Sequence, residues 1–262
     1  MITREDIEND LRALGVVPGD CLMVHSSLAS LGHVLGGAPE VVRALLSAVG
    51  AEGTLVMPAF SPDVSDPASW AEPPPPADLD RARANVPTFD AGATPTTMGV
   101  IPETFRCWPG TLRGTHPQVS VCAQGRLAAQ IVEPHPLAWG QGAGSPFERL
   151  ARQDARLLLL GVGFNRATLL HFAESTLPNR RTKTRRIPVN DSFGRRWIEV
   201  PDVGNDMNTH FPAIGEQFVA AGLAVTGRVG CAHAILASSS RLVAFAAEYL
   251  RRVLPKGAEQ GP

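Results

Sequence analysis

The sequence predicts an α/β protein, a three-layer α/β/α sandwich with a largely parallel mixed sheet and a smaller inserted subdomain. Short apolar segments at 21–25, 53–60 and 157–163 alternate with segments of helical pattern, as in sheets that helices cover on both faces. A hydrophobic content of 44% in 262 residues allows a sizeable buried core. Because the chain shows no internal repeat and no independent linker, we expect residues 1–262 to form a single domain.

The first helix is expected at residues 4–14, because both of its ends carry helix signals. Thr3 can act as the N-cap, and Asp6 places a carboxylate in the first turn. Gly15 can adopt the left-handed conformation that closes many helices. A buried strand then follows at 21–25.

A loop rich in serine and glycine, residues 26–37, connects this strand to a second helix. Pro39 begins that helix, which ends near Gly50, and a second buried strand follows at 53–60. Residues 61–97 then break the pattern, because they are rich in proline, alanine and aspartate and include four consecutive prolines. We expect 61–97 to form an inserted lobe or lid.

Regular structure is expected to resume with a helix at 98–106 and a strand at 119–125. Pro102 must then lie in the first turn of that helix. Ser145, followed by a proline and by Glu148, has the pattern of a capping box and predicts a helix that ends near residue 154.

The most apolar strand, within 157–163, leads through a glycine turn into a helix that carries His171. A hairpin is expected to turn near residues 191–194 and to add antiparallel strands. Helices at about 211–221 and 239–253 flank a strand in the sequence LAVTGRVG. The last residues, 255–262, are expected to be disordered.

The overall charge argues for small-molecule chemistry. The formal net charge is −1, and the chain has no long run of one sign except around 180–186, so neither nucleic acid nor an anionic membrane is the expected partner. The N-terminal sequence is acidic where a secretory signal is basic, and no apolar stretch reaches membrane-spanning length, so we expect a cytoplasmic protein. The four scattered cysteines are expected to be reduced, buried thiols.

Two strand ends are expected to meet in one cleft. Ligands of parallel α/β sheets bind beyond the carboxyl ends of strands, where His25, Ser26 and Ser27 lie and where residues 163–168 lie. The loop 26–37 can present N–H groups and hydroxyls to phosphate or amide oxygens, or it can be a turn of small residues only. No dinucleotide or ATP fingerprint is present.

His171 is the strongest candidate for a catalytic base. Glu174 lies three residues further along the expected helix, on the same face, so the carboxylate can contact the imidazole and fix its tautomer. Free histidine titrates near ~6.5 and can therefore accept a proton at neutral pH. The alternative is a metal site made of His25, His116, His171 and Glu174, although no HExxH pattern supports it.

The charged segments allow two interpretations each. The insert has a surplus of carboxylates, which can attract a polycationic amine or can be a solvated loop. We take Asp63 and Asp66, together with Asp206 later in the chain, as the candidate amine-binding carboxylates. The basic segment 180–186 suits nucleotide phosphates or, more simply, a solvated edge strand.

The chain resembles the aminoglycoside 3-N-acetyltransferase family, whose segments it matches in the same order over most of its length. The resemblance implies an α/β/α domain with a subdomain that shapes the amine pocket, acetyl-CoA as co-substrate, no metal, and transfer of the acetyl group to the 3-amino group of aminoglycoside antibiotics, which confers resistance. The matching segments are VHSSLASLG, GGAPEVVRALLSAVGAEGTLVMPAFS, SDPASW, the proline run, FDAGATPTTMGVIPETFR, THPQVS, SPFERL, LLLLGVG and TLLHFAE.

By this resemblance, His171 is the general base of a direct transfer in a ternary complex, Glu174 is its supporting acid, and Thr168 adjoins both. A larger set is implied to bind acetyl-CoA: His25, Ser26, Ser27, Leu28, Ser30, Gly32, Thr97, Met98, Gly99, His116 and Ser120.

The chain departs from the family pattern where the acceptor is expected to bind. It has ADLDRAR after the proline run, His210 before the late phenylalanine, and an unusually basic stretch after Glu174. An acetyltransferase for another amine, a metal-dependent hydrolase and a catalytically silent CoA-binding or amine-sequestering protein therefore stay open, as does a homodimer.

Overall fold

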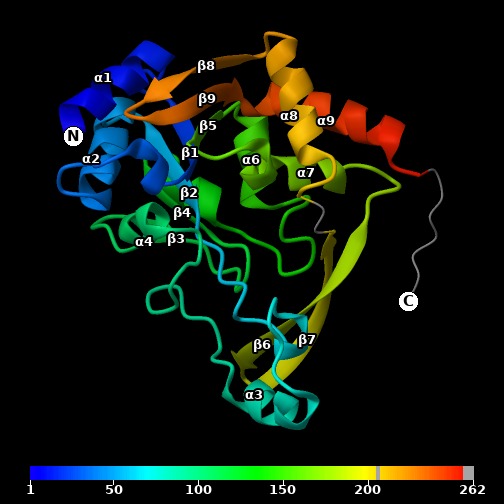
Figure 1. Ribbon diagram of the computed structural model, residues 1–262. Coiled ribbons are helices and arrows are strands. Elements are labelled where there is room, and N and C mark those ends of the chain that lie inside the picture. The colour runs from blue at the N-terminus through cyan, green and yellow to red at the C-terminus, as the bar shows by residue number, and fades with distance from the viewer. Residues whose placement is uncertain (205–206, 256–262) are drawn as a thin grey trace.

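A seven-stranded mixed sheet forms the centre of the protein (Figure 1). The computed structural model describes residues 1–204 and 207–255. The strand order is β3-β4-β2-β1-β5-β9-β8. The strands are β1 (Cys21–Ser26), β2 (Thr54–Pro58), β3 (Leu112–Arg113), β4 (Val121–Gly125), β5 (Arg156–Leu160), β8 (Ala224–Val229) and β9 (Ala232–Ser238).

The centre of this sheet is parallel and its margins are antiparallel. Strand β1 lies between β2 and β5 and runs parallel to both. Strands β4 and β9 pair antiparallel with the outer sides of β2 and β5, and β3 and β8 extend the sheet at its two edges. The predicted mixed α/β sheet is therefore confirmed, and β3 and β9 are additional strands that the sequence did not predict.

Helices cover both faces of the sheet, as Figure 1 shows. Alternate residues of β5 show the three layers directly. Leu158 and Leu160 belong to the core under α1, α2 and α4, whereas Leu157 and Leu159 belong to the core under α5 to α9. The helices are α1 (Arg4–Leu14), α2 (Ala38–Val49), α4 (Val100–Arg106), α5 (Ala128–Val132), α6 (Pro146–Arg152), α7 (Leu169–Ser175), α8 (Phe211–Ala220) and α9 (Ser239–Val253).

The helix ends follow local chemistry that the sequence shows. In α1 the Thr3 hydroxyl accepts from the N–H of Asp6, whose carboxylate accepts from the N–H of Thr3, and Gly15 closes the helix with φ of 105°. In α6 the Ser145 hydroxyl accepts from the N–H of Glu148, and the Glu148 carboxylate accepts from the N–H of Gly144 at 2.7 Å.

The predicted hairpin is present but forms a sheet of its own. Strands β6 (Thr182–Asp191) and β7 (Gly194–Val203) pair from end to end and extend away from the central sheet (Figure 1). The insert lies against this hairpin and contains α3 (Leu79–Asn85). Arg195 donates to the carbonyl oxygens of Arg83 at 2.9 Å and Val86 at 2.6 Å, and the N–H of Asp66 donates to the carbonyl of Arg186. The insert is thus anchored on the hairpin.

The structure also bears on the predictions for the C-terminal tail, the cysteines and membrane-spanning segments. The tail expected at 255–262 lies outside the described residues apart from Pro255. All four cysteines are free thiols, but Cys107 and Cys231 are exposed, which corrects the expectation that all are buried. Within the described ranges, none of the helices has the length and apolar character needed to cross a bilayer.

Candidate active site

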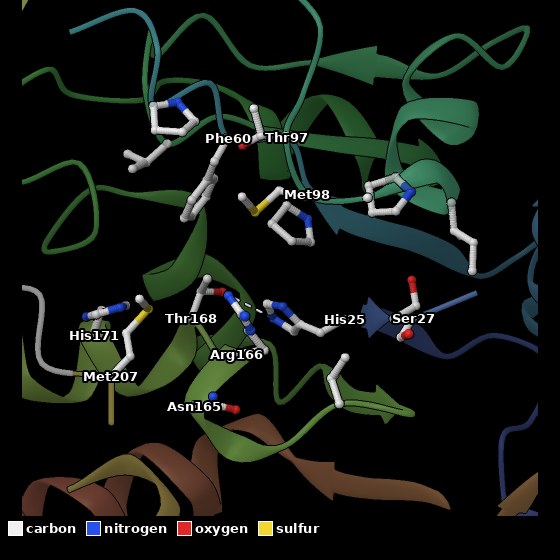
Figure 2. A pocket seen from close by; sticks show the side chains of 18 of the residues that line it. His25, Ser27, Phe60, Thr97, Met98, Asn165, Arg166, Thr168, His171 and Met207 are labelled. Atoms are coloured by element: carbon white, nitrogen blue, oxygen red, sulfur yellow. Dashed lines mark hydrogen bonds between the residues drawn. The ribbon is translucent and has the colours of Figure 1, made fainter. Parts of the chain in front are cut away.

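A cavity of about 790 Å³ opens where β1 and β5 end. The register of these parallel strands places Ser26 beside Leu160, so the segments that follow both strands share one edge of the sheet. Figure 2 shows His25, Ser27, Thr97, Met98, Thr168 and His171 around this space. The two strand ends therefore converge on one cavity, as expected from the order of the strands.

His171 faces the cavity from α7 and is 5% exposed. Its ring packs edge-on against Phe211, with ring centroids 4.9 Å apart. The buried Nδ1 atom has no hydrogen-bond partner, which leaves Nε2 as the nitrogen that a ligand can reach. Burial, assisted by the nearby Lys183 cation, lowers the pKa of His171 to about 3, so the imidazole is neutral at pH 7.

Glu174 does not contact His171, which corrects the expectation of a hydrogen-bonded pair. The Glu174 carboxylate is fully buried and bonds Arg181 instead, with Nε to Oε1 at 2.7 Å and Nη2 to Oε2 at 2.9 Å. A buried carboxylate needs a full positive charge beside it, and a neutral imidazole does not supply one. The chain turns after α7, and this turn brings Arg181 back to the Glu174 carboxylate. The spacing of residues along a single helix does not predict such a contact.

Thr168 and His25 form a buried pair in the middle of the cavity wall. Thr168 Oγ1 lies 3.3 Å from His25 Nε2, across 143 residues of sequence (Figure 2). Burial and the charge of Arg166 lower the pKa of His25 to about 3. A neutral His25 can therefore orient the Thr168 hydroxyl, which lies between the two histidines.

Six of the residues that the resemblance implies for acetyl-CoA line the cavity beside His25: Ser26, Ser27, Leu28, Thr97, Met98 and Gly99. Ser30 and Gly32 do not line it and instead shape the loop. Ser30 Oγ bonds the Ser27 hydroxyl at 3.0 Å and the Gly161 carbonyl at 3.1 Å. Gly32 has φ of 85°, and a Cβ there would lie 2.9 Å from the Cys231 sulfur, so only glycine fits.

His116 and Ser120 lie behind the cavity wall and bond protein groups. His116 Nδ1 accepts from the N–H groups of Gln118 and Val119, both at 3.1 Å, and Nε2 donates to the Leu137 carbonyl at 3.2 Å. The Ser120 hydroxyl donates to the Ala59 carbonyl and accepts from Arg113. Both side chains are fully buried, so their observed contacts are structural.

The two candidate amine-binding carboxylates of the insert, Asp63 and Asp66, do not line the cavity. Asp66 is buried and pairs with Arg83, at 3.0 Å, and with Arg186. Asp63 is exposed and is not part of the cavity lining, and Asp206 lies outside the described residues. Neither aspartate of the insert therefore faces the cavity.

The hairpin supplies a polar wall of the cavity from the basic segment 180–186, for which the sequence left nucleotide phosphates or a solvated edge strand open. Lys183 and Arg185, two residues apart on β6, both line the cavity, together with Gln118 and Gln141. Burial and the charge of Arg185 lower the pKa of Lys183 to about 7. The one sequence signal for this wall is the alternation of side chains along a strand, which places residues 183 and 185 on one face and their neighbours on the other.

The donor groups proposed for a metal site do not converge. In residues 1–204 and 207–255, no three side chains of His, Cys, Asp or Glu lie close enough to share a metal ion. His116 is committed to backbone groups and Glu174 to Arg181.

Comparison with known proteins decides the family. The family profile described as aminoglycoside 3-N-acetyltransferase matches residues 23–251. The chain belongs to this family.

Relatives and solved structures of the family match nearly the whole chain. The SPbeta prophage-derived aminoglycoside N(3')-acetyltransferase-like protein YokD of Bacillus subtilis (strain 168) is 38% identical over 94% of this chain and 92% of its own. Aminoglycoside N(3)-acetyltransferase VIII of Streptomyces fradiae is 35% identical over 95% and 92%. The structure of AAC-IIIb in a binary complex with CoASH has a TM-score of 0.86 at 30% identity and covers 98% and 99% of the two chains.

Proposed function

We propose that this protein is an acetyl-CoA-dependent N-acetyltransferase that acetylates the 3-amino group of the deoxystreptamine ring of aminoglycosides and thereby confers resistance. One observation carries the proposal: a single cavity joins the neutral imidazole of His171 to the loop that follows β1. Family membership and the CoASH complex of AAC-IIIb support the choice of acetyl donor.

The donor is assigned to the end of the cavity at His25, Ser26, Ser27 and residues 97–99. Hydroxyls, a glycine with φ of 105° and the thioether of Met98 gather there. These groups suit the amide and thioether chain of CoA, which is long and largely uncharged. Arg166, exposed at the same end, supplies a positive charge for the phosphates.

The acceptor is assigned to the end at His171, where transfer proceeds directly between the two substrates. His171 Nε2 takes a proton from the attacking amine while the nitrogen forms a bond to the thioester carbonyl carbon. The Thr168 hydroxyl donates to the resulting oxyanion, held in place by neutral His25. Collapse breaks the carbon–sulfur bond, and the CoA thiolate takes the proton from His171.

Glu174 is proposed to act on the position of α7 and not on the imidazole itself. Its carboxylate ties the C-terminal end of this short helix to Arg181 at the start of the hairpin. This connection links the helix that carries His171 to the element that carries Lys183 and Arg185.

A second candidate, an acetyltransferase for a different amine, is favoured by the charge of the wall. The ionised side chains among the described lining residues are Arg166, Lys183 and Arg185, whereas a polycationic acceptor is best held by carboxylates.

Release of the free CoA thiol, measured with a panel of aminoglycosides and of smaller amines, tests both candidates. We expect turnover of at least one deoxystreptamine aminoglycoside, with acetylation at the 3-amino group shown by mass spectrometry and NMR. Turnover of smaller amines alone would replace the first candidate by the second. Absence of turnover with every amine would reject both.

A further inference from the structure

Four side chains form a closed network on the hairpin side of the cavity. Asp202, fully buried on β7, pairs with Arg185 through Oδ2 and Nε at 2.6 Å. Arg185 also donates from Nη1 to Gln118 Oε1 at 2.8 Å and from Nη2 to Gln141 Oε1 at 3.2 Å. The backbone N–H of Gln141 donates to Asp202 Oδ1 at 3.3 Å and so closes the network. We call these four residues the hairpin network.

The guanidinium group determines how both glutamine amides are oriented. Arginine carries only hydrogen-bond donors, so each amide must turn its oxygen toward Arg185 and its NH₂ group away. The NH₂ group of Gln118 is occupied, because it donates to the Val64 carbonyl at 2.8 Å and the Arg186 carbonyl at 3.4 Å.

The NH₂ group of Gln141 differs, because it has no acceptor among the described residues. Gln141 lines the cavity although the whole residue is only 2% exposed. This amide nitrogen is therefore available to donate to a ligand in the cavity. Arg185 has five N–H groups, of which three are used in the network, so one remains on each of its terminal nitrogens Nη1 and Nη2.

We propose that Gln141 and Arg185 form an oxygen-binding subsite that selects and orients the acceptor substrate. The subsite takes a neutral oxygen, a hydroxyl or ring ether, because Asp202 already balances the charge of Arg185. An ammonium group of the acceptor brings only donors and is excluded from this wall. The acceptor therefore binds with its ammonium groups pointing away from the hairpin network. This inference rests on the proposed function for the identity of the acceptor.

The central test is Gln141→Met, which keeps the approximate size of the side chain and adds no charge. The thioether can no longer donate to a substrate oxygen. We expect KM for a hydroxyl-bearing aminoglycoside to rise about 10-fold, as for the loss of one hydrogen bond with an unpaired partner, while kcat and KM for acetyl-CoA stay unchanged.

Substrates that lack single hydroxyls identify the partner oxygen. A set of aminoglycosides, each missing one ring hydroxyl of a common parent, is measured with the wild type and with Gln141→Met. The wild type should discriminate against one deoxy compound, and the variant should treat that compound and the parent alike. Gln124→Met makes the same chemical change on β4, outside the cavity, and should leave all constants unchanged.

Three results would overturn the inference. One is an unchanged KM in Gln141→Met, and another is an equal loss with every acceptor, which would show a structural role only. The third is a loss above about 100-fold that is confined to a carboxylate-bearing amine and depends strongly on salt, which would assign the subsite to an anion.

Failure of the proposed function is distinguished by calorimetry, which needs no turnover. If the wild type binds the parent aminoglycoside without acetylating it and Gln141→Met weakens that binding about 10-fold, the subsite stands and the reaction does not. If neither binding nor turnover depends on Gln141, the subsite is rejected whatever the reaction.

Discussion

The two sides of the cavity are built in different ways. The sheet side consists of segments that follow β1 and β5, and the parallel register of these strands brings them together. The hairpin side includes Gln118, Gln141 and Arg185, whose side chains are oriented by hydrogen bonds with one another and with the buried Asp202 behind them. Topology therefore positions the first side, and a buried polar network positions the second. A single substitution that disrupts the hairpin network should therefore leave the structure of the sheet side unchanged.

The largest effect should come from Asp202→Ala, which breaks the hairpin network. It leaves the largely buried Arg185 without its counter-ion, at a cost of about 3–5 kcal/mol in the free energy of unfolding. Denaturant unfolding measures this loss. CoA binding on the sheet side, measured by calorimetry on the folded variant, should be retained.

Asp191→Ala is the matched control, because Asp191 pairs with Arg196 in an exposed ion pair at the hairpin tip. Exposed pairs contribute about 0–1 kcal/mol, so this variant should be almost as stable as the wild type. Equal losses in the two variants would show that the network has no special role.

Acid should destabilise both sides of the cavity. Burial lowers the pKa to about 3 for His25, His116 and His171 and to about 4 for His135. The unfolded chain takes up these protons near pH ~6.5, so between about pH 6.5 and 4 it binds more protons than the native state. Stability must therefore fall as the pH is lowered, by up to about 1.4 kcal/mol per pH unit for each histidine.

Urea unfolding at pH 7.5, 6 and 5 measures this dependence. Replacing His116 by Gln should reduce the slope by about one proton. A free energy of unfolding that is constant from pH 7 to 5 would contradict the assignment of neutral buried histidines.

The smallest of these effects should come from Thr168→Val on the sheet side. The variant keeps the shape of the side chain but loses the hydroxyl that His25 orients. We expect kcat to fall about 10- to 100-fold with little change in either KM, because the donor acts on the transition state. Thr168→Ser should retain most of the activity, and a wild-type kcat in Thr168→Val would remove this residue from the mechanism.

The sequence predicts the sheet side because short-range rules suffice there. Capping pairs such as Thr3 with Asp6 lie three residues apart, and apolar strands reveal the ends where ligands bind. The same reasoning correctly brought His25 and His171 to one cavity. It missed β9, whose small and apolar residues follow β8 after a turn at Gly230 and continue directly into α9.

The hairpin side depends on partners that are far apart in the sequence. Arg185 meets Gln141 across 44 residues and Gln118 across 67, and no local pattern encodes such pairs. The same limit explains Glu174, whose helical spacing favours His171 but whose buried charge is satisfied by Arg181 from beyond the next turn. Burial of charge decides these contacts, and burial is a property of the fold.

The most direct measurement of the central claim is the turnover of His171→Ala with acetyl-CoA and an accepted amine. Loss of the general base should lower kcat about 10²- to 10⁴-fold, while calorimetry shows unchanged CoA binding. Added imidazole should restore part of the rate, because it can enter the space that the side chain leaves. Turnover near the wild-type rate without imidazole would contradict the role of His171 as the base.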